Sequence, residues 1–241
     1  MIVFGIHPVE EVLRREPSAI QELLFTGDHL PDTIQSLLGD TSLRPRRVPT
    51  EDLDQLTDDG NHQRVAARLT HFPYAHFDDL LSLTEDNPRA LILALSQVQD
   101  PGNLGAILRS AAALGVDAVL LPKHRAASVT PAVIRASAGM AFHLPIAEVT
   151  NLSRSLKALQ DSGFWIVGTL VDDAQPAWEL DWDMKAVLVM GGEHRGIRPG
   201  VAQHCDFPIT IPLSPAVDSL NVSAAAAVVL YDRLRTLRNT P

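Results

Sequence analysis

The sequence has 241 residues, of which 46% are hydrophobic and 20% are charged, as in an ordinary globular protein. This composition excludes collagen, a coiled coil and a wholly disordered chain. No stretch approaches the roughly 18 uninterrupted apolar residues of a membrane-spanning helix, and the start MIVFGIHPVEEVLRR lacks the basic and apolar regions of a secretion signal. We therefore expect a cytoplasmic protein that does not associate with a membrane.

The formal net charge is −9, and residues 1–100 carry the whole acid excess, with 8 arginines, no lysine and 17 acidic residues. Composition alone therefore does not suggest a nucleic-acid partner, although it does not exclude one. The single cysteine, Cys205, cannot form a disulfide within the chain, and the nine histidines are scattered. We expect neither a disulfide framework nor a bound metal, and His204 and Cys205 are predicted to be structural.

The first hundred residues are predicted to form a small α/β unit. Pro8 is predicted as the first residue of a helix, and apolar residues at helical spacing follow it. Three short runs are predicted as strands: ELLF (22–25), PRRVP (45–49) and RVAARL (64–69). The polar stretch TEDNPR (84–89) is predicted to link an N-terminal domain at residues 1–83 to a second domain at residues 90–241.

The second domain is predicted to contain a parallel sheet covered on both faces. Nearly continuous apolar runs, which such strands require, occur at ALILALS (90–96), AVLLP (118–122), FWIVGTL (164–170) and AVLVMGG (186–192). Helical segments lie at 103–115, 130–139, 150–163 and 219–238; Thr130 and Thr150 are the predicted caps of the second and third, and glycines end the first three. Alternation of strands and helices indicates an open α/β sheet, which binds ligands at loops beyond the carboxyl ends of its strands.

Two loops of this kind carry polar residues that could act on a ligand. In SQVQDPGNLGAILRS (96–110), Asn103 and Arg109 lie about 1.5 helical turns apart; alternatively, Asn103 only caps a helix and Arg109 is a solvated charge. In VMGGEHRGIRPG (189–200), Glu193 lies at the tip of a glycine turn, and glycines let a backbone approach a planar ligand. A simple turn with a solvated Glu193 is the alternative.

A third loop begins the segment IPLSPAVDSLNVSAAAAVVLYD (211–232), where Ser219 and Asn221 precede a long helix of small residues. Ser219 alone would be a helix cap. No G-x-S-x-G motif surrounds it, which disfavours a serine nucleophile. The glycines of the second loop match neither the dinucleotide fingerprint nor the Walker loop, so a dehydrogenase and a phosphate-loop enzyme are both disfavoured.

In this order, the three loops resemble the three motifs of the SpoU (TrmH) family of RNA ribose 2′-O-methyltransferases, within the knotted SPOUT superfamily. The matching pieces are DPGNLGAILRSAAALGV, LVMGGEHRGI and IPLSPAVDSLNVSAAAAVVLYD. FGIHPVEEVLR and NHQRVAARL also look like the family's N-terminal substrate-binding domain, which is similar to ribosomal protein L30e. The two-domain layout is most similar to that of the bacterial 23S rRNA guanosine 2′-O-methyltransferases. The resemblance implies a trefoil knot in the C-terminal domain and a homodimer, with the final helix at the interface or, alternatively, packed in the core.

The resemblance also implies that S-adenosyl-L-methionine is the cofactor. Its expected contacts are Thr169, Met190, Gly191, Ile211, Leu213 and Leu220. The expected polar active-site residues are Asn103, Arg109, Glu193, Ser219 and Asn221. A guanidinium is a poor base near neutral pH, so we expect Arg109 to stabilise the developing alkoxide and bind phosphate, while Ser219 or a water takes the proton. The two asparagines would fix loop geometry, and Glu193 would orient Arg109 or a backbone amide.

RNA binding should depend on basic residues, each of which could instead be an ordinary solvated charge. The candidates are Arg46, Arg47, Arg64 and Arg68 in the N-terminal domain and Lys123, Arg125, Arg135, Arg195 and Arg198 in the C-terminal one. The leading hypothesis is methylation of 23S rRNA. Two alternatives stay open: methylation of tRNA or another rRNA, and a non-catalytic RNA-binding factor in ribosome assembly.

Overall fold

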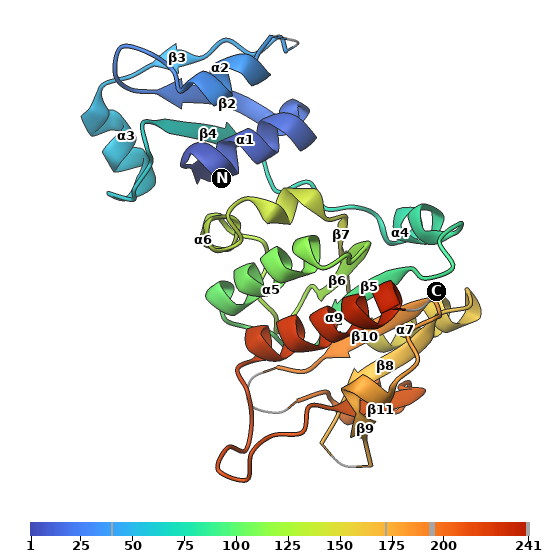
Figure 1. Cartoon of the computed structure of the whole chain (residues 1–241). Coiled ribbons are helices and arrows are strands. Elements are labelled where there is room, and N and C mark those ends of the chain that lie inside the picture. The colour runs from blue at the N-terminus through green and yellow to red at the C-terminus, as the bar shows by residue number, and fades with distance from the viewer. Residues whose placement is uncertain (40, 172, 193–195, 240–241) are drawn as a thin grey trace. The chain divides into compact units, whose positions relative to one another are not determined.

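The structure is a computed structural model of the chain and describes residues 1–39, 41–171, 173–192 and 196–239 (Figure 1). Contacts group the chain into two units, Met1–Pro73 with Val129–His143 and Tyr74–Ser128 with Leu144–Pro241. Residues 129–143 therefore pack with the N-terminal residues, although they lie far along the chain. Packing does not test which parts fold independently, so the domain boundary at 84–89 stays a prediction.

The first unit is built on a four-stranded mixed sheet in the order β1-β4-β2-β3. Its strands are β1 (Ile2–Phe4), β2 (Ile20–Phe25), β3 (Arg46–Arg47) and β4 (Val65–Leu69). β4 runs antiparallel to β1 and β2, whereas β3 runs parallel to β2. The three predicted strands correspond to β2, β3 and β4, but β1 was not predicted because its three residues are too few to show a period.

Short helices complete this unit: α1 (Ile6–Arg15), η1 (Pro17–Ala19), α2 (Asp32–Leu37), α3 (Thr50–Thr57), α6 (Pro131–Ala136) and η2 (Met140–His143). α1 begins at Ile6, so Pro8 is its third residue rather than its first. Side-chain contacts hold residues 129–143 in place. The rings of Phe142 and Phe72 lie 5.3 Å apart, the Arg135 guanidinium lies 5.3 Å from the Phe4 ring centroid, and His143 forms an ion pair with Glu11.

The second unit contains a seven-stranded sheet in the order β7-β6-β5-β10-β8-β11-β9, and every strand pair in it is parallel. Its strands are β5 (Leu91–Leu95), β6 (Ala118–Pro122), β7 (Ile146–Val149), β8 (Trp165–Thr169), β9 (Gln175–Pro176), β10 (Ala186–Met190) and β11 (Phe207–Thr210). Every residue of β5 and β10 is buried. The predicted parallel-sheet α/β fold is thereby confirmed; the knot stays a prediction, because strand order does not record how a chain threads its loops.

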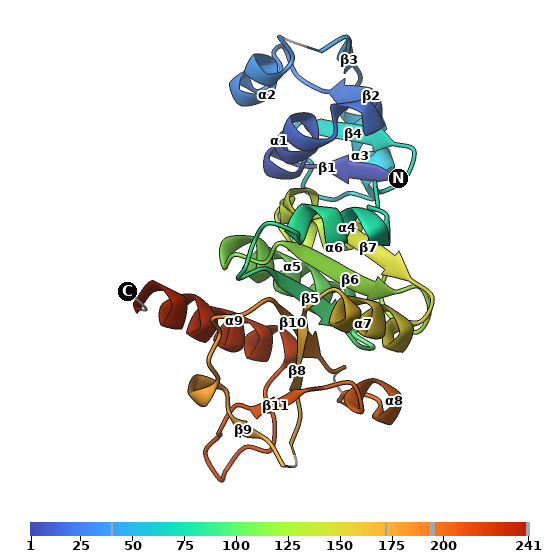
Figure 2. The same ribbon diagram turned by 90° about the vertical axis from the view of Figure 1, so that its right-hand side faces the viewer.

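Helices cover both faces of this sheet, with α5 and α9 packed together on one side and α4 and α7 on the other (Figures 1 and 2). The helices are α4 (Phe77–Thr84), α5 (Pro101–Ala113), α7 (Leu152–Asp161), η3 (Ala177–Glu179), α8 (Pro199–Ala202) and α9 (Val222–Asn239). Within the described residues, none of the helices is long and apolar enough to span a bilayer.

Two helix caps differ from their predictions. α5 begins at Pro101, and the carboxylate of Asp100 accepts the backbone N–H of Asn103 at 2.7 Å, so Asp100 rather than Asn103 caps it. α7 is capped by Asn151, whose Oδ1 accepts the backbone N–H of Arg154, and not by Thr150. In both places the cap is the carboxylate or amide of the residue that directly precedes the helix. The prediction of Thr130 as the cap of α6 is confirmed.

Candidate active site

Three loops at the carboxyl ends of neighbouring strands come together in the second unit. The first loop (residues 96–100) follows β5, the second (191–197) follows β10, and the third (211–221) follows β11. The first and second loops touch at Gly192, where a Cβ atom would collide with the carbonyl oxygen of Gln97. Because β5 and β10 are adjacent parallel strands, their following loops emerge at the same edge of the sheet.

The second loop needs its glycines for contacts within the protein. Gly192 and Gly196 exchange two backbone hydrogen bonds of 3.2 Å, and a Cβ on Gly191 would collide with the backbone of Gly196. The space beside Gly191 and Gly192, where a larger residue would place its Cβ atom, is therefore filled by other backbone atoms of the chain. The predicted site residues Glu193 and Arg195 lie outside the described residues.

Two asparagine side chains join the third loop to the first turn of α5, which directly follows the first loop. Asn221 Nδ2 donates to Asn103 Oδ1 at 2.9 Å. Asn221 Oδ1 accepts the backbone N–H of Ser223 at 2.8 Å and the Ser223 hydroxyl at 2.6 Å, so this residue caps the start of α9. The alternative in which Asn103 merely caps a helix is wrong, because its side chain accepts a bond from a distant loop.

Ser219 and Arg109 occupy different positions around this link. α9 begins at Val222, so Ser219 is an exposed loop residue rather than a helix cap. Arg109 is exposed on α5, and its guanidinium makes no hydrogen bond or ion pair with any residue that the structure describes. Ser219 lines the cavity described next, whereas Arg109, Asn103 and Asn221 do not.

A cavity of about 700 Å³ lies between the second and third loops and the ends of β8 and β11. All six residues predicted to contact a cofactor line it: Thr169, Met190, Gly191, Ile211, Leu213 and Leu220. Its rim exposes apolar side chains, since Val171 is 89%, Val217 49% and Leu220 39% exposed. An exposed apolar rim around a concave site is typical of a small-molecule pocket.

Several cavity residues were not predicted. The first turns of α9 contribute Val222, Ala225 and Val229, whose i, i+3, i+7 spacing is a helical stripe that the sequence displays. The sequence does not show that the amino-terminal part of this stripe faces a cavity rather than the core. Asp218, which precedes Ser219, also lines the cavity and is the acidic residue among its described lining.

Cys205 packs beneath β8 and is not available as a nucleophile. Its Sγ occupies the space beside Gly168, where any Cβ would collide with it. Burial, together with the neighbouring Asp206 carboxylate, raises the pKa of the Cys205 thiol to about 11. A thiol with so high a pKa is almost entirely protonated near neutral pH, which supports the structural role predicted for it.

The predicted RNA-binding cations have different surroundings. Arg46 and Arg68 both bind Glu22, at 3.4 and 2.8 Å, and the hydrogen bond from Arg68 lowers the pKa of that carboxyl. Arg47 pairs with Asp28, and Arg135 covers Phe4. The other described candidates are exposed or half-buried: Arg64, Lys123, Arg125 and Arg198. Arg125 and Arg198 border a separate cavity of about 610 Å³ together with His124.

Comparison with known proteins agrees with this geometry. Residues 90–231 match the SpoU rRNA Methylase family, and residues 2–75 match the family described as RNA 2′-O ribose methyltransferase substrate binding. An uncharacterized tRNA/rRNA methyltransferase of Mycobacterium sp. (strain KMS) is 38% identical over 242 residues, covering 99% of this chain and 77% of that protein.

Solved structures show the same fold. The SpoU methyltransferase AviRb of Streptomyces viridochromogenes, in complex with AdoMet, superposes with a TM-score of 0.84 at 24% identity, covering 99% of this chain and 90% of that one. The AdoMet-bound rRNA methyltransferase of Sinorhizobium meliloti gives a TM-score of 0.82 at 24% identity, covering 98% and 87%. The family matches together span nearly the whole sequence, and this chain therefore belongs to the SpoU family of RNA 2′-O-ribose methyltransferases.

Proposed function

We propose that this protein transfers the methyl group of S-adenosylmethionine to the ribose 2′-hydroxyl of a guanosine in 23S rRNA. The observation that carries the proposal is the cavity of about 700 Å³, which gathers the six predicted cofactor residues beside Ser219. The AdoMet found in the Streptomyces and Sinorhizobium relatives supports the same cofactor here.

The cavity fits such a cofactor in size and chemistry. Pockets for small ligands usually enclose about 300–1,000 Å³, with mostly apolar walls and a few polar groups. Ile211, Leu213 and Leu220 supply apolar surface for a purine and a thioether, and Gly191 contributes to the wall between them. The bound cofactor supplies an electrophilic methyl group on a positively charged sulfur. Asp218, at the rim, carries a charge of the sign that attracts a cation.

The chain's own residues then align the ribose and handle its proton. The Asn221–Asn103 bond fixes the third loop, which carries Ser219 into the cavity wall. Holding two reactants at contact distance can contribute about 7–11 kcal/mol. Ser219, directly or through a water, accepts a hydrogen bond from the 2′-hydroxyl and relays the proton to solvent, giving up its own proton as it receives that of the ribose. Arg109 binds a phosphate of the RNA and stabilises the developing alkoxide, because a guanidinium holds its proton too tightly to act as a base near neutral pH. Glu193 orients Arg109.

The family matches support an rRNA substrate. Residues 2–75 match a substrate-binding family, and residues 90–231 match a family named for rRNA methylation.

Exposed apolar side chains on α9 support a homodimer. Val228 and Tyr231 are 46% and 61% exposed, and an apolar strip of this kind suits a contact with a second copy of the chain. Sedimentation of the purified protein should therefore give twice the mass of one chain.

The test incubates the purified protein with labelled S-adenosylmethionine and, separately, unmodified 23S rRNA, 16S rRNA and tRNA, followed by digestion and mass spectrometry of the nucleosides. We expect 2′-O-methylguanosine from 23S rRNA alone. Another 2′-O-methylated nucleoside, or product from tRNA, would retain the reaction and overturn the substrate. No product from free RNA or from ribosomal particles would overturn the function.

A further inference from the structure

Four arginines of the first unit were candidates for RNA binding, and the structure separates one of them from the others. Arg46 and Arg68 share Glu22, and Arg47 pairs with Asp28. Arg64 is exposed, and its guanidinium makes no hydrogen bond or ion pair with the residues the structure describes. An RNA phosphate at Arg64 would therefore not have to displace a carboxylate of this part of the chain.

The backbone at Arg64 adopts a conformation that most residues avoid. Gln63 and Arg64 have φ angles of +50° and +67°, in the left-handed region that favours glycine. Consecutive non-glycine residues in this region persist only where the surrounding structure holds them. Their surroundings therefore show what keeps this turn in place.

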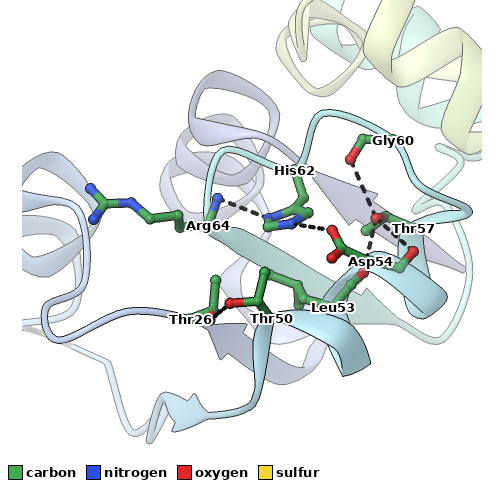
Figure 3. A network of polar contacts seen from close by, with 8 residues as sticks. All are labelled: Thr26, Thr50, Leu53, Asp54, Thr57, Gly60, His62 and Arg64. Atoms are coloured by element: carbon green, nitrogen blue, oxygen red, sulfur yellow. Dashed lines mark hydrogen bonds and ion pairs between the residues drawn. The ribbon is translucent and has the colours of Figure 1, made fainter.

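Hydrogen bonds fix the turn from both sides. Nδ1 of the buried His62 accepts the backbone N–H of Arg64 at 2.9 Å, so the ring proton is on Nε2, which donates to Asp54 Oδ1 at 2.9 Å (Figure 3). The Arg64 carbonyl accepts the backbone N–H of Thr26 at 3.0 Å. The Gln63 side chain accepts the backbone N–H of Ile6. Most polar groups around the Arg64 backbone thus have partners within the protein, while the guanidinium points away from the network (Figure 3).

The Arg64 side chain lies over Gly27, where a Cβ would come within 3.5 Å of its Nη1 atom. Gly27 lines a surface cavity of about 490 Å³ with Arg47 and with Thr26 and Thr50, whose hydroxyls share a hydrogen bond of 2.8 Å. The acidic side chains nearby are Asp28, which is already paired with Arg47, and Glu51 and Asp52, which are exposed in the first turn of α3. The cavity therefore has two guanidinium groups at its edge, of which Arg47 is already paired, and one of the two threonine hydroxyls in its wall keeps its proton for a ligand.

We propose that Arg64 binds a backbone phosphate of the substrate RNA at this cavity, and that the His62–Asp54 pair is a positioning pair that holds it there. The proposal rests on the function proposed above. The Arg64 guanidinium, whose N–H groups have no partner among the described residues, can donate two parallel hydrogen bonds to a phosphate. The hydrogen-bonded turn at positive φ fixes the direction in which the Arg64 side chain leaves the backbone. Because Arg64 does not belong to the cofactor site, its effect falls on RNA affinity and not on the chemical step.

The test compares Arg64→Gly with the wild-type protein in binding to transcribed 23S rRNA over a range of salt concentrations. Glycine adopts positive φ readily, so this variant keeps the turn while it removes the guanidinium. We expect binding about fivefold to tenfold weaker, and a slope of log affinity against log salt that is smaller by about 0.7–0.9, as for one lost phosphate contact. The KM for RNA should rise while kcat at saturating RNA and the affinity for S-adenosylmethionine stay unchanged.

Arg44→Gly is the matched control, since it removes the same charge from an exposed residue whose guanidinium, among the described residues, hydrogen-bonds to the Leu43 carbonyl alone. An equal change of slope in Arg44→Gly, or an unchanged slope in Arg64→Gly, would overturn the proposal. If no RNA is methylated but the slopes still differ as expected, the proposed reaction fails and the phosphate contact stands. Wild-type protein that binds no RNA would overturn both.

The positioning pair is tested by a double-mutant cycle with Asp54→Asn and His62→Ala, each in the wild-type and Arg64→Gly backgrounds. If the pair acts through Arg64, its replacement should weaken RNA binding in the first background and have no further effect in the second. Additive losses would show that His62 and Asp54 only stabilise the unit. Circular dichroism checks folding, and Asp54→Asn remains informative if His62→Ala fails to fold.

Discussion

The side-chain amide of Asn221 donates a hydrogen bond to Oδ1 of Asn103 at 2.9 Å and thereby joins residues 118 positions apart. The oxygen of the same amide accepts two bonds from Ser223, so neither end of the Asn221 side chain is free to turn. The bond connects the first turn of α5 to the loop that carries Ser219. It is a direct link between the first and third sequence motifs, and it assigns the two asparagines a shared task.

Replacing either asparagine should therefore slow methyl transfer. We expect Asn221→Ala and Asn103→Ala each to lower the single-turnover rate roughly tenfold, which corresponds to about 1.4 kcal/mol for one hydrogen bond to an aligned loop. The double variant should be no slower than the worse single variant, because the same contact is lost in each. Fully additive losses, measured by a double-mutant cycle, would contradict a shared role.

Arg109 should affect the reaction and leave the cofactor site unchanged. It is exposed on α5 and does not line the cavity, so Arg109→Ala should bind S-adenosylmethionine as the wild type does. Loss of a group that stabilises transition-state charge typically lowers kcat by about 10²–10³. Arg154→Ala, an exposed arginine on α7, is the control. Equal rates of RNA methylation in Arg109→Ala and the wild type would exclude Arg109 from the active site.

Gly192 and Gly200 offer a matched pair of glycine substitutions. In Gly192→Ala the new Cβ would collide with the Gln97 carbonyl, whereas at Gly200 nothing lies within 4 Å of it. Gly192→Ala should therefore push the first and second loops apart and weaken S-adenosylmethionine binding at least about fivefold, as overpacking of a tight site costs roughly 1–3 kcal/mol. Gly200→Ala should bind normally. Calorimetric titration measures both, and equal affinities would show that the loops yield without cost.

The parts of the fold that could be predicted are those whose signal lies within a single helix or strand. The apolar runs that became β5 and β10 are buried on both faces, and a parallel strand needs that property along its whole length. The ends of helices were predicted less well. The segment DPGN (100–103), for example, holds two residues, Asp100 and Asn103, whose side chains can cap a helix. The sequence does not show which one does, because the answer depends on Asn103 having a partner 118 residues away.

Contacts between distant segments could not be predicted from the sequence. The pattern at 130–139 predicts a helix, and the structure contains one, but nothing in the sequence shows that this region packs with the N-terminal residues. Phe142 against Phe72 and Arg135 over Phe4 are long-range pairs that carry no local signal. The same holds for the cavity, where the motifs identified Gly191 and Leu220 but not Val229, because a small-residue helix looks alike whether it faces a ligand or a core.

Cys205 should make the stability of the protein fall at high pH. Burial raises the pKa of its thiol from 9.0 to about 11, so the folded state disfavours the thiolate. The resulting stabilisation is fully present below the pKa of the unfolded thiol and is lost as the pH rises from about 9 to about 11, an effect of at most about 2 kcal/mol. Cys205→Ser has no titrating group there, so the difference in free energy of unfolding between the wild type and this variant, measured with urea, should shrink across that range while other ionisations cancel. A difference that stays constant with pH would show that the thiol is not desolvated as its packing against Gly168 implies.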